Sequence, residues 1–249
     1  MIQRIYVHNF RCLENFELKL GSLSSALLIG KNGSGKSTLR LVLEILQSIG
    51  RQSIGQGENR VGKLVDSKDF ACGRSNVPMR FEIEVLLNRT PYKYELALEL
   101  PAGFKELRVL DEQLTVAGNI IFSRKNAQVH LRPNRQQNQE SRFLVDWHLI
   151  ALPVIQQSED DPIHMFRTWL ARAVILSPIP QIVKGESKGE TLEPKSDGSN
   201  FAEWFAGLLS RTPGSLHSNY RLSPESTARY RRLSESANRK GFQELSGSF

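Results

Sequence analysis

The sequence predicts an α/β fold in which a glycine-rich loop joins a buried strand to a helix, next to an antiparallel β-subdomain and a helical segment. Three observations lead to this prediction. A glycine-rich stretch at residues 30–38 stands between an apolar run at 25–29 and a segment of helical period at 39–47. Apolar and polar residues alternate in four runs between 81 and 124, and apolar residues recur at helical spacing between 161 and 209.

Two strands are expected before the glycine-rich stretch. The first has apolar residues at Ile2, Ile5, Val7 and Phe10, and the second alternates from Phe16 to Leu20. The apolar run Ser25–Ile29 is then expected to be a buried strand, because it is short, continuous and followed at once by glycine. Strand, glycine-rich loop and helix thus follow one another in the order that a phosphate-binding loop needs.

Residues 30–38 read Gly-Lys-Asn-Gly-Ser-Gly-Lys-Ser-Thr and fit the pattern G-x-x-x-x-G-K-[ST] without a mismatch. Glycine lets such a backbone turn its N–H groups around phosphate oxygens at a helix N-terminus, where the helix dipole favours an anion. Lys36 is placed to reach the β- and γ-phosphates, and the hydroxyl of Ser37 to ligate Mg²⁺. The candidate binding residues of the loop are Gly30, Asn32, Gly33, Ser34, Gly35, Lys36, Ser37 and Thr38.

The middle of the chain predicts two antiparallel hairpins. Residues 48–76 are rich in glycine, serine and charge and are expected to form a long loop, with one turn or strand at 63–65. Alternating runs at 81–87 and 92–100 predict the first hairpin, turning at Asn88–Pro91, and a second is expected from Leu107 to Arg124, turning at 117–119. Residues 125–141 are polar and are expected to be a mobile connection.

Two helices are predicted after this connection. Asp161-Pro162 is typical of a helix start, and the helix should end before Pro178. A second helix is expected at 201–209, after a capping region at Asp197–Asn200. Its apolar positions form an aromatic-rich stripe that we expect to face the core: Phe201, Trp204, Phe205, Leu208 and Leu209.

Charge and cysteine content bound the remaining possibilities. Of the net charge of +7, +4 lies from Arg211 onward, where seven Lys/Arg stand against three Asp/Glu, so residues 211–249 are expected to be a basic, serine-rich tail that is either solvated or disordered. Cys12 and Cys72 are too few and too far apart for a disulfide framework. With no apolar run of roughly 20 residues and no secretory signal, the expected location is the cytoplasm, away from membranes.

The stretch from Ile5 to Phe16, which contains Asn9-Phe10-Arg11, followed by the loop at 30–38, resembles the opening of the ABC-type ATPase heads of the SMC/RecF class. Within that class the sequence is similar to bacterial AAA-family ATPases grouped with the OLD nucleases and anti-phage ATPases. The resemblance runs from residue 1 to about 210, which is expected to be one N-terminal lobe. It implies ATP and Mg²⁺ as ligands, and it implies that Arg11 contacts the nucleotide.

The same resemblance implies a signature helix opening with Leu-Ser-x-Gly and a strand ending in Asp-Glu, and neither is found in this chain. Asp111-Glu112 is expected to be structural, because Arg108 interrupts its apolar run, and so is Asp146, because Trp147 stands where the glutamate should be. Leu245–Ser248 begins four residues from the end, too late to introduce a helix. The C-terminal lobe of such a head is therefore expected to be missing. Three glutamines are equal candidates for sensing Mg²⁺: Gln156, Gln157 and Gln181.

The favoured interpretation is an ATP-binding head that serves DNA repair or anti-phage defence, and that hydrolyses ATP weakly or not at all by itself. By resemblance it would act as a homodimer through an ATP sandwich or with a complementing subunit, and DNA or a nuclease is a further expected partner. Two alternatives stay open: the nucleotide-binding subunit of an ABC transporter, and a P-loop kinase or other P-loop NTPase. A permease gene nearby would favour transport, and a nuclease or toxin gene would favour defence.

Overall fold

The computed structural model describes residues 1–249 except 22, 24, 52–59, 133–139, 156–157 and 212–249. The chain divides into two compact units, one at residues 1–175 and the other from 176 onward, and each is described by itself. Among the described residues, none of the helices is both long enough and apolar enough to cross a membrane.

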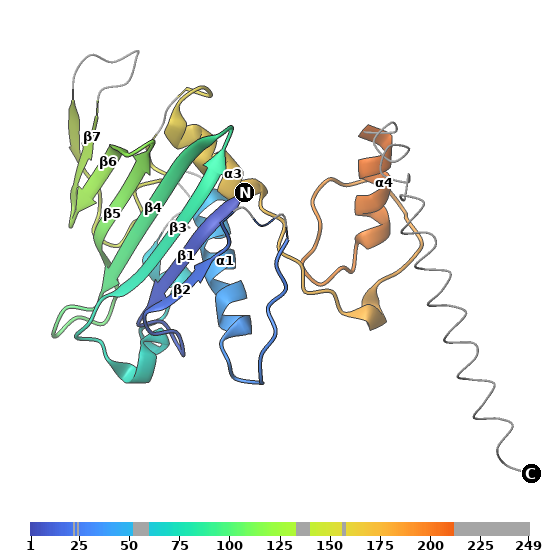
Figure 1. Ribbon diagram of the computed structural model, residues 1–249, viewed down its shortest axis with the longest axis horizontal. Coiled ribbons are helices and arrows are strands. Elements are labelled where there is room, and N and C mark those ends of the chain that lie inside the picture. Colours follow the sequence, from blue (N-terminus) through green and yellow to red (C-terminus); the bar gives the residue numbers. More distant parts are fainter. Residues whose placement is uncertain (22, 24, 52–59, 133–139, 156–157, 212–249) are drawn as a thin grey trace, which may run out of the picture. The chain divides into compact units, whose positions relative to one another are not determined.

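One antiparallel sheet forms the body of the first unit. Its strand order is β2-β1-β3-β4-β5-β6-β7-β8, and strands that are neighbours in this order are hydrogen-bonded to each other (Figure 1). The strands are β1 (Ile2–His8), β2 (Phe16–Lys19), β3 (Met79–Leu87), β4 (Thr90–Glu99), β5 (Arg108–Val116), β6 (Asn119–Lys125), β7 (Gln128–Leu131) and β8 (Ser141–Leu144). The predicted hairpins are confirmed, as are the two strands at the start of the chain.

The alternation in the sequence sorts the side chains onto two faces. In β3, Phe81 and Ile83 are buried, whereas Glu82 between them belongs to an outward-facing row that includes Glu95, its partner in β4. On this open face Arg4 forms ion pairs with three carboxylates of neighbouring strands, Glu17, Glu82 and Glu84. The open face is therefore stabilised by charge pairs, and the other face builds the core.

Two helices, α1 (Lys36–Arg51) and α3 (Pro162–Arg172), cover the apolar face of the sheet (Figure 1). Phe166 of α3 is fully buried, stacks on Tyr92 of β4 and packs at a tilt against Tyr94 of the same strand. Asp161 caps α3 by accepting a hydrogen bond from the Ile163 amide, and Pro162 occupies the first turn, as the sequence predicts. The predicted helix at 39–47 is confirmed in α1, which is longer at both ends.

The prediction of a mobile connection at 125–141 is wrong in part. Within this range, β7 occupies Gln128–Leu131 and β8 begins at Ser141, while 133–139 lies outside the described residues. Val129 is fully buried and Leu131 nearly so. Two apolar residues in a four-residue strand give too short an alternation to stand out among polar neighbours.

The prediction of a long loop at 48–76 is also wrong in part. Helix α1 extends to Arg51, α2 covers Val61–Leu64, and two 3₁₀ turns, η1 and η2, lie at Ser67–Asp69 and Ala71–Gly73. The expected turn at 63–65 is thus confirmed as helical. These elements are only three or four residues long and are fixed by burial of residues such as Val61 and Phe70, so periodicity could not detect them.

The prediction of a buried strand at Ser25–Ile29 is wrong for the described structure. These residues join none of the sheet's strands, and the side chains of Leu27 and Ile29 are 83% and 87% exposed. A strand needs a neighbour for its backbone N–H and C=O groups, and the described part of the chain supplies none here. The described fold thus has the α/β content and the antiparallel sheet that the sequence predicts, without a sheet around the glycine-rich loop.

The second unit contains η3 (Pro180–Ile182) and α4 (Phe201–Arg211), where the second helix was predicted. The expectation that its aromatic stripe faces the core is wrong, because Phe201 and Phe205 are 44% and 42% exposed and stack on each other. Instead, α4 is buried at Gly207, where an added Cβ would stand 2.3 Å from the Thr191 carbonyl oxygen. Of the predicted tail at 211–249, Arg211 is the last residue of α4, and residues 212–249 lie outside the described residues.

Candidate functional site

The glycine-rich loop turns between Gly30 and Gly35 and leads directly into α1. Gly33 and Gly35 take left-handed φ values of 82° and 90°, which glycine adopts without strain. The ammonium group of Lys36 lies against the loop, where it donates hydrogen bonds to the carbonyl oxygens of Gly30 at 2.6 Å and Lys31 at 2.9 Å and to the Ser34 hydroxyl at 3.2 Å. The ammonium group of Lys36, at the start of the helix, is therefore held by atoms of the loop.

The N-terminus of α1 is suited to an anion. Lys31, Asn32, Lys36 and Ser37 are exposed, and the first turn of the helix carries no acidic side chain that would neutralise its dipole. The unpaired N–H groups of a helix start and one lysine are the elements that hold phosphate in loops of this sequence pattern. The structure thus brings the predicted loop residues together at one exposed helix start.

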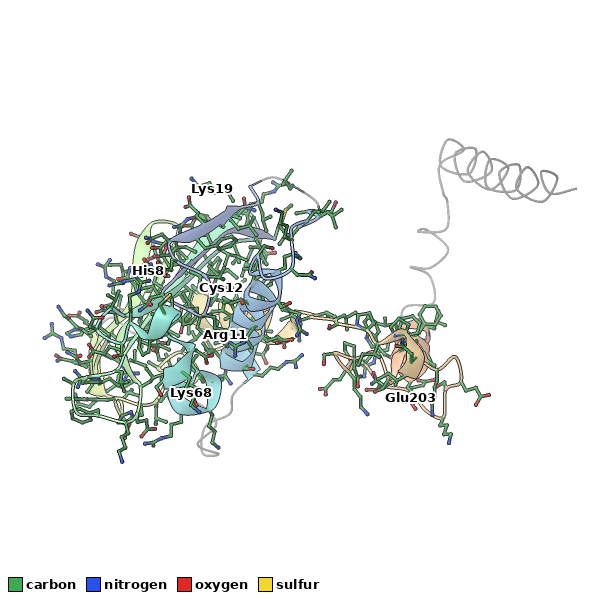
Figure 2. The ribbon with its side chains drawn as sticks, turned by 90° about the horizontal axis from the view of Figure 1, so that it is seen from below. His8, Arg11, Cys12, Lys19, Lys68 and Glu203 are labelled. Carbon is green, nitrogen blue, oxygen red and sulfur yellow. The ribbon has the colours of Figure 1, made fainter. Side chains whose placement is uncertain are left out.

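The connection between β1 and β2 lies against this loop. Leu13 is buried, and its Cδ2 lies 2.7 Å from the point where a Cβ on Gly35 would stand. Cys12, labelled in Figure 2, has its Sγ 3.3 Å from the Thr38 hydroxyl. A side chain at position 35 would collide with Leu13, so Gly35 is needed for this contact as well as for its φ.

Arg11 makes its described contacts on the far side of the same connection. Its Nε donates to Asp69 Oδ1 at 2.8 Å, its amide donates to the Asp69 carbonyl oxygen, and its guanidinium lies 5.7 Å from the centre of the Phe10 ring. The guanidinium is half exposed. The nucleotide contact expected of Arg11 stays a prediction, and it would require the Asp69 ion pair to open or be shared.

Glu112 is buried on the helix-covered face of the sheet. Its two carboxylate oxygens accept hydrogen bonds from the Tyr94 hydroxyl at 2.9 Å and from the amides of Ala151 and Leu152 at 2.8 Å each, and Arg124 lies 3.7 Å away. Burial raises the pKa of Glu112, although Arg124 and the two amides oppose this effect. These contacts give Glu112 the structural role that the sequence predicts.

Asp111 and Asp146 also lie in structural settings. Asp111 belongs to the row of β5 side chains on the open face of the sheet. Asp146 closes a turn, because its Oδ1 accepts from the His148 amide at 2.7 Å and its carbonyl oxygen accepts from Arg124. Of the glutamines considered for Mg²⁺, Gln181 is exposed in η3, and Gln156 and Gln157 lie outside the described residues. Leu245–Ser248 lies outside them too.

Sequence reasoning did not find the role of Leu13 and Cys12 beside the loop. No spacing rule links residues 12 and 13 to 35 and 38, since the contact depends on how the β1–β2 connection folds. The available hint was Asn9 and Asn15, because asparagine is enriched at left-handed positions and both residues take such φ values, 54° and 47°. A tight turn could have been predicted there, but not the surface it packs on.

Two comparisons with known proteins bear on this site. A family model described as an AAA ATPase domain matches residues 1–146, which include the loop and the whole sheet. An OLD nuclease from Thermus scotoductus (strain ATCC 700910 / SA-01) is 41% identical over 46 residues. This similarity covers 18% of the present chain and 8% of the length of that nuclease.

Proposed function

Because the chain belongs to the AAA ATPase domain family, we propose that it binds ATP with Mg²⁺ at residues 30–38. The observation that carries this proposal is the loop itself, a glycine turn that ends in Lys36 at an exposed helix start. Lys36 would hold the β- and γ-phosphates by exchanging its carbonyl contacts for phosphate oxygens, and the Ser37 hydroxyl would ligate Mg²⁺. The metal ion would neutralise phosphate charge, and the loop amides would orient the phosphates.

We also propose that the loop works together with a second chain. The support is the exposed run Ala26–Ile29 directly before the loop, with apolar side chains and a backbone that joins none of the described strands. Such a run is a site for strand addition, since a neighbouring strand would pair its backbone and cover its side chains. The partner is either a second copy, in a homodimer that sandwiches ATP, or a complementing subunit.

The biological role proposed is DNA repair or anti-phage defence, with DNA or a nuclease as a further partner. Its support is narrower than that for nucleotide binding, because it comes from the 46 residues that are similar to the OLD nuclease. The nuclease activity in that name belongs to a protein of which this similarity covers 8%, and it is not proposed for this chain.

Calorimetric titration with ATP-Mg²⁺ tests the binding proposal. Replacing Lys36 with Ala removes a charge-assisted contact to phosphate, and we expect binding to weaken by about 1.5–3 kcal/mol. Lys31→Ala is the matched control, because it removes the same charge from the same loop and keeps the carbonyl that Lys36 contacts. We expect that control to bind within about threefold of the unmodified chain, as for an exposed charge. Equal affinity of the chain and its Lys36→Ala form would place the nucleotide elsewhere.

A further inference from the structure

The β1–β2 connection touches the phosphate-binding loop at two points, and these points flank its two chemically active residues. Leu13 packs on Gly35, and Cys12 meets the hydroxyl of Thr38. Lys36 and Ser37 lie between these positions in the sequence. Any shift of the connection would therefore move the start of α1, where the lysine and the serine are attached.

The β1–β2 connection is itself fixed by contacts with residues outside the loop. Asn9 donates through its side-chain amide to the carbonyl oxygens of Arg74 at 3.0 Å and Val77 at 2.6 Å. Phe10 is fully buried, packs edge-on against Phe81 with ring centres 5.1 Å apart, and exchanges two backbone hydrogen bonds with Leu13. With Arg11 bonded to Asp69, the connection is tied both to β3 and to the segment before it.

This connection also contains two unfavourable features. Arg11 takes a left-handed φ of 52°, for which it lacks the tolerance of asparagine. Asn9 Oδ1 is buried, and among the described residues it has no hydrogen-bond partner. Such features collect at functional sites, where the surrounding contacts enforce them.

We propose that Leu13 is a positioning residue for nucleotide binding, which holds Gly35 so that Lys36 and Ser37 meet the phosphates without rearrangement. The inference rests on the proposed binding of ATP at residues 30–38. Leu13 does not contact the ligand, and its effect comes from keeping the loop in its binding conformation before the ligand arrives. It should therefore act on every ligand that the loop holds through phosphate.

The test compares ATP-Mg²⁺ with Mg²⁺-pyrophosphate, which offers the loop phosphate groups alone. We expect Leu13→Ala to weaken the binding of both ligands by about tenfold, because a preorganised loop is lost. Leu13→Met keeps the side-chain volume and should bind within about twofold of the unmodified chain. Leu114→Ala is the matched control, since Leu114 is a buried leucine of β5 whose partners across the sheet are Tyr94 and Phe122; it too should stay within about twofold.

The outcomes separate this inference from the proposed function. If the unmodified chain and its Lys36→Ala form bind ATP equally, the binding proposal fails. If binding depends on Lys36 but Leu13→Ala resembles Leu114→Ala, the positioning role of Leu13 is overturned. A loss for ATP without one for pyrophosphate also overturns it. Should Leu13→Ala not fold, Leu13→Val serves the same comparison, with an expected affinity below that of Leu13→Met.

Discussion

Glu112 and Asp111 are neighbours in β5 and lie on opposite faces of the sheet. Replacing the carboxylate with an amide should therefore lower stability much more at Glu112 than at Asp111. Glu112→Gln places an amide N–H₂ where the carboxylate now accepts three hydrogen bonds, and it removes the negative charge that lies 3.7 Å from the buried Arg124. We expect a loss of about 1–3 kcal/mol in the free energy of unfolding. Asp111→Asn, on the open face, should change it by less than about 0.5 kcal/mol. Urea unfolding of the three proteins measures both, and equal effects would contradict this account of β5.

The raised pKa of Glu112 predicts the sign of a pH dependence. Its pKa in the folded protein lies above the unfolded value of about 4.3, so the folded state holds the proton more tightly. The stabilisation from this group is fully present below the unfolded pKa and is lost as the pH rises through the folded pKa. The stability of the unmodified chain relative to Glu112→Gln should therefore fall as the pH rises from the unfolded pKa through the raised folded pKa. A difference that grows with pH would show that the buried carboxylate prefers its charged form.

At the scale of elements, the packing of α1 on α3 depends on Gly50. A Cβ there would stand 2.6 Å from the Ala171 amide nitrogen and 2.9 Å from the Arg167 carbonyl oxygen, both atoms of the α3 backbone. Alanine is the better helix former by about 1 kcal/mol, yet we expect Gly50→Ala to destabilise by about 1–3 kcal/mol, because overpacking forces the helices apart. Thermal unfolding checks the sign.

Gly62→Ala is the matched control for Gly50→Ala. Gly62 also lies in a helix, α2, and its added Cβ would meet nothing nearer than Glu106 Oε1 at 3.6 Å, an ordinary contact. We expect this change to be neutral or stabilising by up to about 1 kcal/mol. If both alanine variants were stabilised, the two helices would have room to adjust, and the close approach at Gly50 would not limit their packing.

The elements that the sequence predicted best are long and strongly periodic. Residues 81–124 alternate over four strands and α1 repeats its apolar face over four turns, so each signal was repeated many times. Strand β7 gave two apolar residues and could not be told from a polar loop. Ala26–Ile29 failed for another reason, because its composition fits a buried strand and only the lack of a described neighbour leaves it exposed. The composition of a segment shows that it can form a buried strand, but it forms one only where a neighbouring strand is present to pair with it.

For the whole molecule, the sequence predicted the glycine-rich loop at residues 30–38 because its pattern lies in consecutive residues. The surface that supports the loop comes from three segments, the β1–β2 connection, residues 69–77 and the start of α1, whose meeting depends on tertiary packing. No local pattern carries such information. A catalytic carboxylate would be equally hard to predict, because it can lie beside the loop in space without being near it in the sequence.

Our prediction for the whole molecule is that this chain alone hydrolyses ATP weakly. A water-orienting carboxylate and further charge at the γ-phosphate are needed beside the loop. In the described part of the chain, no carboxylate bonds to residues 30–38, and Glu112 is committed to Tyr94, Ala151 and Leu152. We expect the purified chain to release phosphate far more slowly than about 1 s⁻¹, the low end of ordinary enzyme rates, and no faster than its Lys36→Ala form.

A partner that supplies a water-orienting carboxylate should raise turnover, and the exposed run Ala26–Ile29 offers a way to recognise such a partner. Leu27→Lys puts a charge on a side chain that is 83% exposed, so it should leave the stability of the isolated chain and its affinity for ATP nearly unchanged. In a complex that pairs a strand with this run, the same charge would be buried and would weaken assembly. We therefore expect phosphate release by the unmodified chain to rise when the partner is added. The rise should be smaller when the partner is added to the Leu27→Lys variant. Lys36-dependent turnover near 1 s⁻¹ by the chain alone, unaffected by Leu27→Lys, would mean that its own residues complete the site.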